Sequence, residues 1–354
     1  MKLEQHIEKL KIKMENDREP FKYLKAAKRL MYKIKKKLKW NPMDLGLINL
    51  CGILAIETNN LDLAYKMFKQ AVFLNPTVYS LNNLAYFYLY EYDDSQKSVE
   101  LLERSINMEP TSELPYALLG QAYIDLNNFE KAEYYLKKAV QINPTHIILN
   151  NLGVAAYRLG KIEDSINWFK ESLNLLQVTE TLISYGFALA RNGRRDDSEE
   201  VAEQLCIKFN EFLDSGKLYI FSEVMPVEIG EIFYENMNYV KANDCFERAM
   251  EYGAGDFISY YQYSLLQVSK IQRADDILKQ YILEKEKDIE ELREYDYYSE
   301  RETNELISSY REEIDSISDI YEKIKIGYRP SIEFIPRILG GCYLFGCIRH
   351  RNKI

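Results

Sequence analysis

The sequence predicts an all-α protein built as a solenoid of repeated helical hairpins. The first observation is a set of four prolines spaced by 34 residues: Pro42, Pro76, Pro110 and Pro144. The second is that small and large residues recur in register between these prolines. The third is the composition, because 15 Gly and 9 Pro among 354 residues are too few for a chain of strands and turns. A unit this short buries its apolar side only against its neighbours, so the repeats are expected to stack.

Each repeat is expected to contain two antiparallel helices. Proline cannot continue a helix and disfavours the helical conformation of the preceding residue, so each proline ends a second helix. In the best copy, residues 113–144, Gly120 on the first helix and Ala132 and Ala139 on the second predict close packing. Threonines after three of the prolines are expected to cap the next helix: Thr77, Thr111 and Thr145.

This layout resembles the tetratricopeptide repeat family, whose pattern is a Leu-Gly pair and a Tyr in the first helix, two Ala and a Phe in the second, and a closing Pro. The matching positions define about seven copies. In six of them the glycine position is occupied by Gly52, Ala85, Gly120, Gly153, Gly186 and Gly230. The weakest copy, from Tyr260 to Tyr281, includes Leu265 and Ala274. The resemblance implies a right-handed superhelix whose concave face binds a partner protein or peptide, without catalysis.

Charge and repeat pattern divide the chain into four expected parts. Residues 1–44 form a basic helical cap, since residues 1–40 carry a net charge of +9 while the remainder carries −18. Residues 45–282 form the repeat array. Residues 283–325 form an acidic helical extension, with apolar residues at helical spacing that would lie against the last repeat. Residues 326–354 form an apolar and basic tail.

The basic helix predicted at residues 21–40 has two interpretations. It is either a degenerate second helix that caps the first full repeat, or a surface for nucleic acid or an anionic membrane. The acidic body argues against nucleic-acid binding by the superhelix itself, because phosphates would be repelled. The lysines that would carry the second interpretation are Lys25, Lys28, Lys35, Lys36 and Lys39.

The tail has three interpretations. Cys342, Cys347 and His350 are three metal-ligating side chains, but their spacing fits no zinc motif and no fourth ligand is near, so no metal is expected. The tail is instead expected to form an apolar plug over the open end of the superhelix, as terminal repeats need covering. The third interpretation is a docking segment for a membrane or a partner.

Catalysis finds little support in the sequence. The three histidines, His6, His146 and His350, form no nucleophile or base constellation, and no Gly-rich phosphate loop is present. We therefore expect no enzyme activity and no cofactor. Five irregularly spaced cysteines indicate reduced thiols and a cytoplasmic location, and we expect neither a signal peptide nor a membrane-spanning helix.

The candidate ligand site lies on the first helices, where the family resemblance places the concave face. Asparagine pairs precede two of the Leu-Gly positions, and Leu118 interrupts the row between them. An amide offers both a donor and an acceptor, so a row of amides can pair with the main chain of an extended peptide. One Asn of each pair has the alternative role of capping or bridging helices. The candidate residues are Asn49, Asn82, Asn83, Tyr86, Asn150, Asn151, Tyr157, Arg158, Phe187 and Arg191.

The sequence thus favours a non-catalytic scaffold that binds a protein or peptide. A peptide-responsive regulator is one alternative, in which a small peptide changes what the end segments bind. A factor that binds nucleic acid or an anionic membrane through the basic N-terminal helix is another.

Overall fold

The computed structural model describes residues 20–215, 225–252, 257–294 and 298–348, with Leu10 and Gly255. Within these residues the chain forms sixteen helices and no strand, labelled α2 to α17. The fold is therefore all-α, as predicted. The chain divides into two compact units, residues 1–176 with 338–354 and residues 177–337.

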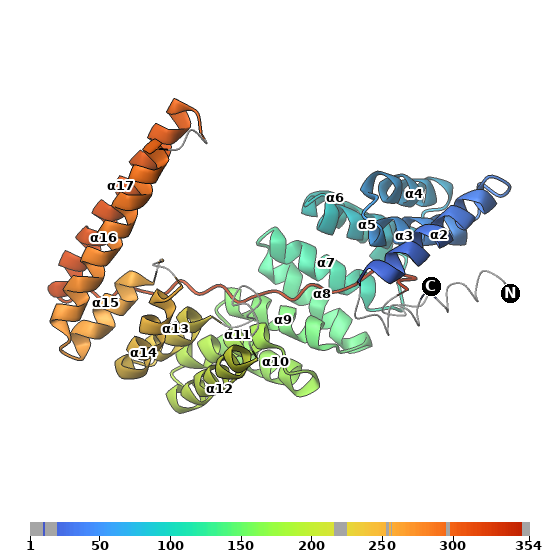
Figure 1. Cartoon of the computed structure of the whole chain (residues 1–354). Helices are drawn as coiled ribbons and strands as arrows, with labels where there is room; N and C mark the ends of the chain where they lie inside the picture. Colours follow the sequence, from blue (N-terminus) through green and yellow to red (C-terminus); the bar gives the residue numbers. More distant parts are fainter. Residues whose placement is uncertain are drawn as a thin grey trace. The chain divides into compact units, whose positions relative to one another are not determined.

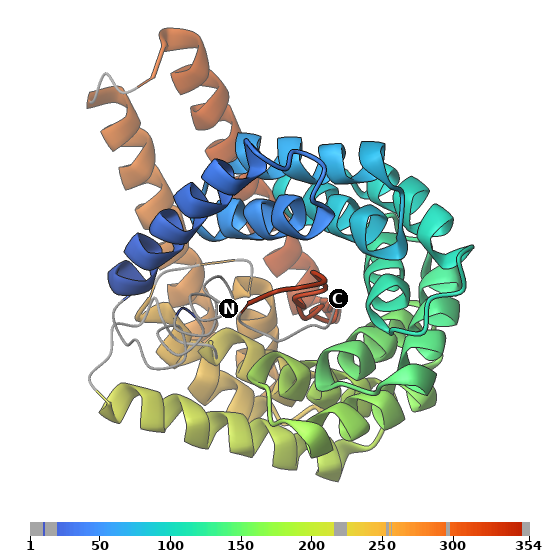
Figure 2. The same cartoon turned by 90° about the vertical axis from the view of Figure 1, so that its right-hand side faces the viewer.

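Unit 1 contains one leading helix and four helical hairpins. The leading helix is α2 (Pro20–Leu38). The hairpins are α3 (Leu45–Glu57) with α4 (Leu61–Leu74), α5 (Val78–Glu91) with α6 (Ser95–Ile106), α7 (Leu114–Asp125) with α8 (Phe129–Ile142), and α9 (His146–Arg158) with α10 (Ile162–Leu175). Figure 2 shows these blue-to-green helices as a curved layer, with the dark red C-terminal residues of the unit on its inner side.

Unit 2 contains three hairpins and a final long helix (Figure 1). The hairpins are α11 (Thr179–Arg191) with α12 (Arg195–Asp214), α13 (Pro226–Glu235) with α14 (Tyr239–Met250), and α15 (Ile258–Gln267) with α16 (Ile271–Glu294). The final helix is α17 (Glu300–Lys325). Because α16 extends to Glu294, the first residues of the expected acidic extension continue the second helix of the last hairpin.

The two helices of a hairpin pack where the sequence places a glycine. A Cβ built on Gly120 would lie 2.5 Å from Cγ of Leu136, and one on Gly52 would lie 2.6 Å from the ring of Phe68. The same glycine-to-large-residue step, sixteen positions along the chain, recurs at Gly153 with Phe169 and at Gly230 with Phe246. These contacts confirm the predicted repeat register.

The helix starts follow the expected capping in two of three cases. Thr77 and Thr145 each accept a hydrogen bond from the backbone N–H three residues on, at 3.3 Å. Thr111 does not cap α7, which corrects the prediction. The helix begins later, at Leu114, and the hydroxyl of Ser112 accepts from the Leu114 N–H at 3.3 Å.

Helix α2 covers one side of the first hairpin. Its apolar residues Ala27, Leu30, Met31 and Ile34 are buried in one core with residues of α3 and α4. The five lysines of the candidate basic surface are exposed. The capping role predicted from the apolar stripe is therefore seen in the packing of α2.

The last two helices of unit 2 pack along each other through their apolar sides. Ile289 on α16 and Ile307 and Tyr321 on α17 are buried, and Lys285 forms an ion pair with Glu313 at 2.6 Å. The remaining charged residues of both helices are largely solvent-facing, which is the usual state of such charge runs.

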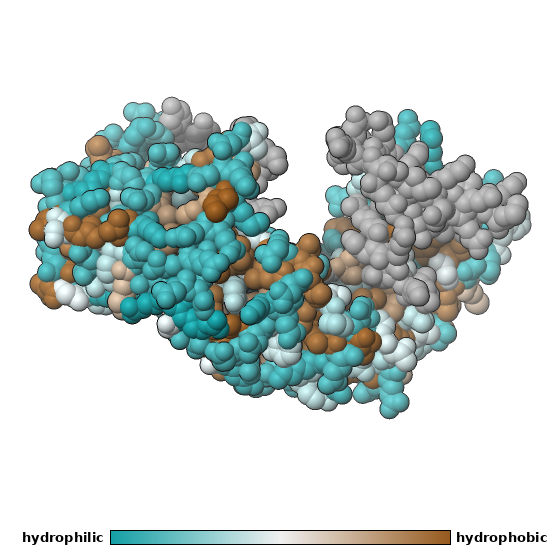
Figure 3. Space-filling view, turned by 90° about the horizontal axis from the view of Figure 1, so that it is seen from below, coloured by the Kyte–Doolittle hydropathy of each residue, from teal (hydrophilic) through white to brown (hydrophobic). Residues whose placement is uncertain are grey.

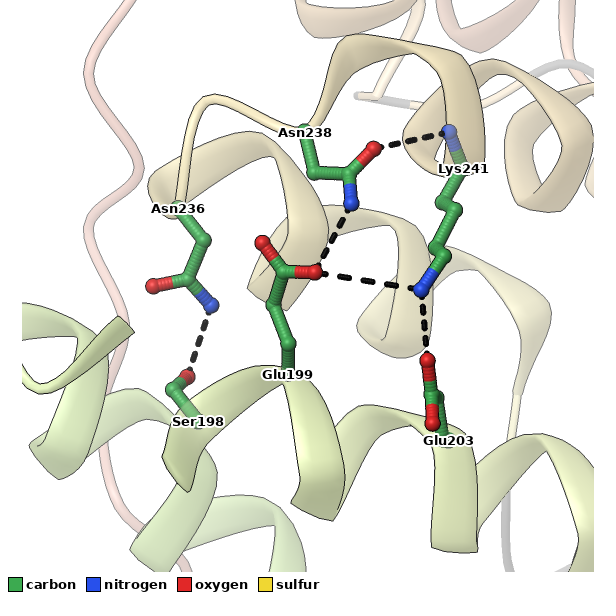
Figure 4. A network of polar contacts seen from close by, with 6 residues as sticks. All are labelled: Ser198, Glu199, Glu203, Asn236, Asn238 and Lys241. Atoms are coloured by element: carbon green, nitrogen blue, oxygen red, sulfur yellow. Dashed lines mark hydrogen bonds and ion pairs between the residues drawn. The ribbon is translucent and has the colours of Figure 1, made fainter. Parts of the chain in front are cut away.

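Polar contacts hold three helices of unit 2 together at the turn between α13 and α14 (Figure 4). Asn238 caps α14 by accepting from the Lys241 N–H and donates to Glu199 on α12 at 2.8 Å. The Lys241 ammonium forms ion pairs with Glu199 and Glu203. Asn236 donates to the Ser198 hydroxyl at 2.8 Å. One turn thereby fixes the position of the next hairpin.

The face drawn in Figure 3 is largely hydrophilic, with scattered hydrophobic patches, as is ordinary for protein surfaces. No helix in the described part of the chain is long and apolar enough to cross a membrane. None of the five cysteines forms a disulfide.

The tight glycine contact yields a prediction about stability. Gly120→Ala should lower the free energy of unfolding by about 1–3 kcal/mol, because overpacking strains a close helix contact. Gly46→Ala is the matched control, since its Cβ would meet only an Asp44 oxygen, at 3.5 Å, and it should be neutral or stabilising by up to about 1 kcal/mol. Urea unfolding followed by circular dichroism measures both. Equal effects of the two substitutions would contradict the observed packing.

Candidate functional site

Buried asparagines on three first helices of unit 1 form a surface that we call the asparagine face. A buried amide costs free energy unless it is hydrogen bonded. Asn49, Asn82, Asn83 and Asn151 hydrogen bond to the main chain of residues 338–348, the C-terminal segment. The members of the asparagine face, each at most 8% exposed, are Asn49 on α3, Asn82 and Asn83 on α5, and Asn150 and Asn151 on α9.

Asn83 and Asn49 together hold Phe345. The Asn83 Oδ1 accepts from the Phe345 N–H at 2.8 Å, and its Nδ2 donates to the Phe345 carbonyl at 3.0 Å. Asn49 donates to the same carbonyl at 3.2 Å and accepts from Asn83 at 2.7 Å. The Asn83 amide therefore satisfies both main-chain groups of one residue, and Asn49 orients it.

Asn151 holds Leu339 in the same way. Its Oδ1 accepts from the Leu339 N–H at 2.8 Å, and its Nδ2 donates to the Leu339 carbonyl at 2.9 Å. The neighbouring Asn150 donates to the Asn151 Oδ1 at 3.1 Å. In each asparagine pair, the second residue thus makes the two-sided contact with the main chain.

Two further residues hold the segment between these points, and both were missed from the sequence. The Tyr90 hydroxyl accepts from the Gly341 N–H at 3.3 Å and donates to Oε1 of buried Gln121 on α7 at 2.8 Å. Burial raises the pKa of Tyr90 to about 12, so the phenol keeps the proton that it donates. A sequence signal did exist, because Tyr90 lies one helical turn after Tyr86 and Gln121 interrupts an apolar run.

The hydrogen bonds recur at every second residue of the segment. Leu339, Gly341 and Phe345 make the contacts described above, and the carbonyl of Tyr343 accepts from Asn82 at 2.7 Å. A period of two is that of an extended strand, in which alternate residues direct their main-chain groups to the same side. Side chains of unit 1 thus supply the hydrogen bonds that a neighbouring strand would supply in a β-sheet. In Figure 1 the dark red trace of this segment is correspondingly stretched out.

Apolar side chains of the segment add burial to these hydrogen bonds. Phe345 is 2% exposed and its ring meets the Tyr79 ring edge-on at 4.6 Å between centroids. Leu344 is buried in the core cluster that also contains residues of α2, α3 and α4, with Tyr86 packed against it. Burial raises the pKa of Tyr86. Tyr86, an expected site residue, therefore packs against the apolar cluster that contains Leu344 of the segment.

Unit 2 has a comparable arrangement around residues 329–337. The Tyr234 hydroxyl donates to the Pro330 carbonyl at 2.7 Å, and the Ser184 hydroxyl accepts from the Arg337 N–H at 3.2 Å. Phe187, an expected site residue, stacks on Phe334 at 3.8 Å between ring centroids. Neither Ser184 nor Tyr234 was among the site residues predicted from the sequence.

Two arginines of residues 329–337 add charged contacts to this arrangement in unit 2. The Arg337 guanidinium is hydrogen bonded to the Glu228 carboxylate on α13. Burial raises the pKa of Glu228, although the neighbouring guanidinium acts in the opposite direction. Arg329 lies over the Tyr234 ring at 4.8 Å and donates to the Tyr234 carbonyl at 3.1 Å.

Three expected site residues have other surroundings. Arg158 lies over the Phe129 ring at 4.4 Å and donates to Asn127 at 3.4 Å, so it bridges two hairpins. Tyr157 is 6% exposed within α9. Arg191 is exposed in the last turn of α11, where its charge acts on Glu235.

The tail was expected to form an apolar plug, and its Leu344, Cys347 and Ile348 join the core of α2, α3 and α4. Its residues 338–348 lie along the first helices of unit 1, because the asparagine face supplies partners for their main chain. Of the three metal-ligating side chains considered in the tail, Cys342, Cys347 and His350, the last lies outside the described residues. Among those that are described, no three His, Cys, Asp or Glu side chains are grouped to hold a metal ion.

Comparison with known proteins agrees with this helical repeat architecture. Residues 115–146 and 147–180 each match a tetratricopeptide repeat model. The structure of PilW, a type IV pilus biogenesis factor, matches at 17% identity and a TM-score of 0.52, over 65% of this chain and 98% of that one. Residues 115–180 thus match two consecutive tetratricopeptide repeats, and the likeness to PilW shows the fold that they share.

Two other solved structures are more distant in shape. A tetratricopeptide repeat protein from Parabacteroides merdae matches at 16% identity and a TM-score of 0.46, over 74% of this chain and 98% of that one. YrrB, described as a protein of this class with an unusual peptide-binding site, matches at 16% identity and a TM-score of 0.43, over 48% and 89%. No curated protein matches the sequence significantly.

The two-sided contact of Asn83 yields a prediction about local opening. Asn83→Ala leaves the main chain of Phe345 without two hydrogen bonds, a loss of about 1–3 kcal/mol. Amide hydrogen exchange in residues 339–348 should accelerate by about tenfold or more. Asn41→Ala is the control, because Asn41 is exposed and its side chain donates to Asp44, three residues away in the same turn. Unchanged exchange in this segment, with a lower melting temperature, would assign Asn83 to helix packing alone.

Proposed function

We propose that this protein is a non-catalytic scaffold whose asparagine face binds an extended peptide or an extended segment of a partner protein. The observation that carries the proposal is the period-two pattern of hydrogen bonds from helix side chains to the main chain of residues 339–345. A surface that pairs with a main chain in this way fits any peptide of suitable length and shape.

The chemistry of the surface supports a peptide rather than a small charged ligand. Amide groups donate and accept, as the peptide main chain also does, so the two are matched at Asn83 and Asn151. The surface also carries aromatic side chains: Tyr79 against Phe345, Tyr90 at the Gly341 N–H, and Tyr86 beside the cluster that contains Leu344. Affinity would come from the main chain, and selectivity from these aromatic contacts.

A peptide-responsive regulator is a narrower form of the same proposal. The C-terminal segment occupies the surface that a ligand would use, so ligand binding and release of the segment are coupled. A change in the position of the tail would then be the response. A cytoplasmic location, inferred from the five cysteines outside disulfides, belongs to this proposal too.

The alternative of binding to nucleic acid or an anionic membrane rests on the exposed lysines of α2. Membrane-lying helices insert an apolar stripe, but Ala27, Leu30 and Ile34 of α2 are already buried against the first hairpin. The packing of α2 therefore favours the peptide proposal over the membrane alternative.

The proposal predicts binding in trans once the segment is displaced. Phe345→Asp places a charge at a position that is 2% exposed and should release the segment. The full chain with this substitution should then bind a fluorescent peptide of residues 338–348, with Ser in place of both cysteines, in an anisotropy titration. Adding Asn83→Ala should weaken binding about 5- to 100-fold through the lost hydrogen bonds, whereas adding Asn41→Ala should not.

A Phe345→Asp chain with unchanged helix content that binds no peptide would overturn the proposal. So would equal effects of Asn83→Ala and Asn41→Ala, because the peptide would then bind somewhere other than the asparagine face.

A further inference from the structure

The C-terminal segment shows which side chains the asparagine face accepts, and this deduction rests on the proposed function. The segment adds no helix to the unit, and its main-chain hydrogen bonds to Asn49, Asn82, Asn83, Tyr90 and Asn151 are those that any extended peptide offers. An incoming peptide therefore takes over each bond in turn, and selection must act through the side chains.

Glycine is required two residues before the first aromatic side chain. A Cβ on Gly341 would lie 2.5 Å from Cζ and 2.8 Å from the hydroxyl oxygen of Tyr343. The Tyr343 ring is itself fixed, because it is 4% exposed. No side chain at position 341 is compatible with an aromatic ring in this place.

Tyr343 fits its place imperfectly. Its hydroxyl is buried and finds no hydrogen-bond partner within the described part of the chain. The Oδ1 of Asn82, whose Nδ2 donates to the Tyr343 carbonyl, also has none there. Burial raises the pKa of Tyr343, and Tyr90, Tyr86 and Cys342 raise it further. A buried hydroxyl without a partner weakens binding, so phenylalanine would fit this position better.

The next positions call for a second aromatic residue and a glycine. Phe345 is buried against the edge of the Tyr79 ring. Gly346 follows with a φ of 77°, in the left-handed region that favours glycine, where the chain turns. The Cys347 N–H donates to the Leu344 carbonyl at 3.3 Å and closes this turn.

From these four positions we infer that residues 339–346 act as an internal competitor, and that the partner that displaces them carries an uncharged extended segment of the form Gly-x-Phe-x-Phe-Gly. The chain's own Gly341-x-Tyr343-x-Phe345-Gly346 is a weaker version of this segment, because of the Tyr343 hydroxyl. The face is thereby closed in the absence of the partner and open to exchange in its presence.

The test uses the full chain without an opening substitution and two fluorescent peptides of residues 338–348, one with Tyr and one with Phe at position 343. Both carry Ser in place of the cysteines. The Phe peptide should bind about tenfold more tightly than the Tyr peptide, which corresponds to about 1.4 kcal/mol. A third peptide with Ala at position 341 should bind at least tenfold more weakly than the Tyr peptide, because of the clash with the ring.

Matched substitutions in the chain should act in the opposite direction. Tyr343→Phe should close the face and weaken binding of the Phe peptide about tenfold, while Gly341→Ala should open it and strengthen binding by a similar factor. Tyr328→Phe is the control, since Tyr328 is 49% exposed and lies outside residues 338–348. Tyr343→Phe removes one atom and Gly341→Ala adds one, so folding is checked simply by circular dichroism.

The outcomes separate this inference from the proposed function. If the Phe345→Asp chain binds the peptides but Tyr343→Phe and Gly341→Ala leave their affinity unchanged, the segment is no competitor and only the inference fails. Equal affinities of the Tyr and Phe peptides would overturn the stated selectivity. A second copy that donates its own C-terminal segment would instead produce a dimer in sedimentation, and this would replace the partner peptide as the occupant.

Discussion

The close contact between a small residue on each first helix and a large side chain on the second sets the spacing on which the rest of this structure depends. Gly52, Gly120, Gly153 and Gly230 bring the helices of their hairpins together to a distance that leaves no room for a Cβ. Because this contact recurs at the same place in successive hairpins, the first helices present equivalent positions to one side. Asn83 and Asn151 each lie two residues before the small residue of their repeat. The contact that aligns the hairpins therefore also places these two amides at equivalent positions on the first helices.

Buried polar groups carry specificity in both units, but by different means. In unit 2, Asn236 and Asn238 at one turn connect α12, α13 and α14 through Ser198 and Glu199, and every contact serves the stacking of hairpins. In unit 1, the amides of α5 and α9 are directed at a main chain that belongs to no helix. An amide can perform either role, and only its partner distinguishes a structural asparagine from one that recognises a peptide.

The sequence was sufficient for the hairpins and for part of the site. The 34-residue proline spacing and the glycine positions predicted the helices and their register, because these depend on neighbours close along the chain. Asn83 and Asn151 were candidates for the same reason, although their role as ligand-binding residues stays a prediction. The occupant was not predictable, since Asn83 and Phe345 are separated by 262 residues and main-chain hydrogen bonds leave no side-chain pattern. The tail was expected to cover an open end because the sequence shows its apolar composition. Its main-chain hydrogen bonds at every second residue cannot be read from the sequence.

The attachment of the C-terminal segment to the chain that it contacts has a quantitative consequence. A tethered segment competes at a fixed effective concentration, which is set by the length and stiffness of its connection and does not change with the amount of protein. A free peptide of equal intrinsic affinity must reach that concentration to occupy half of the molecules. The tether thus sets a threshold, and peptides that match the face only weakly are excluded. A ligand displaces the segment only when its higher affinity compensates for a concentration below the effective concentration of the segment.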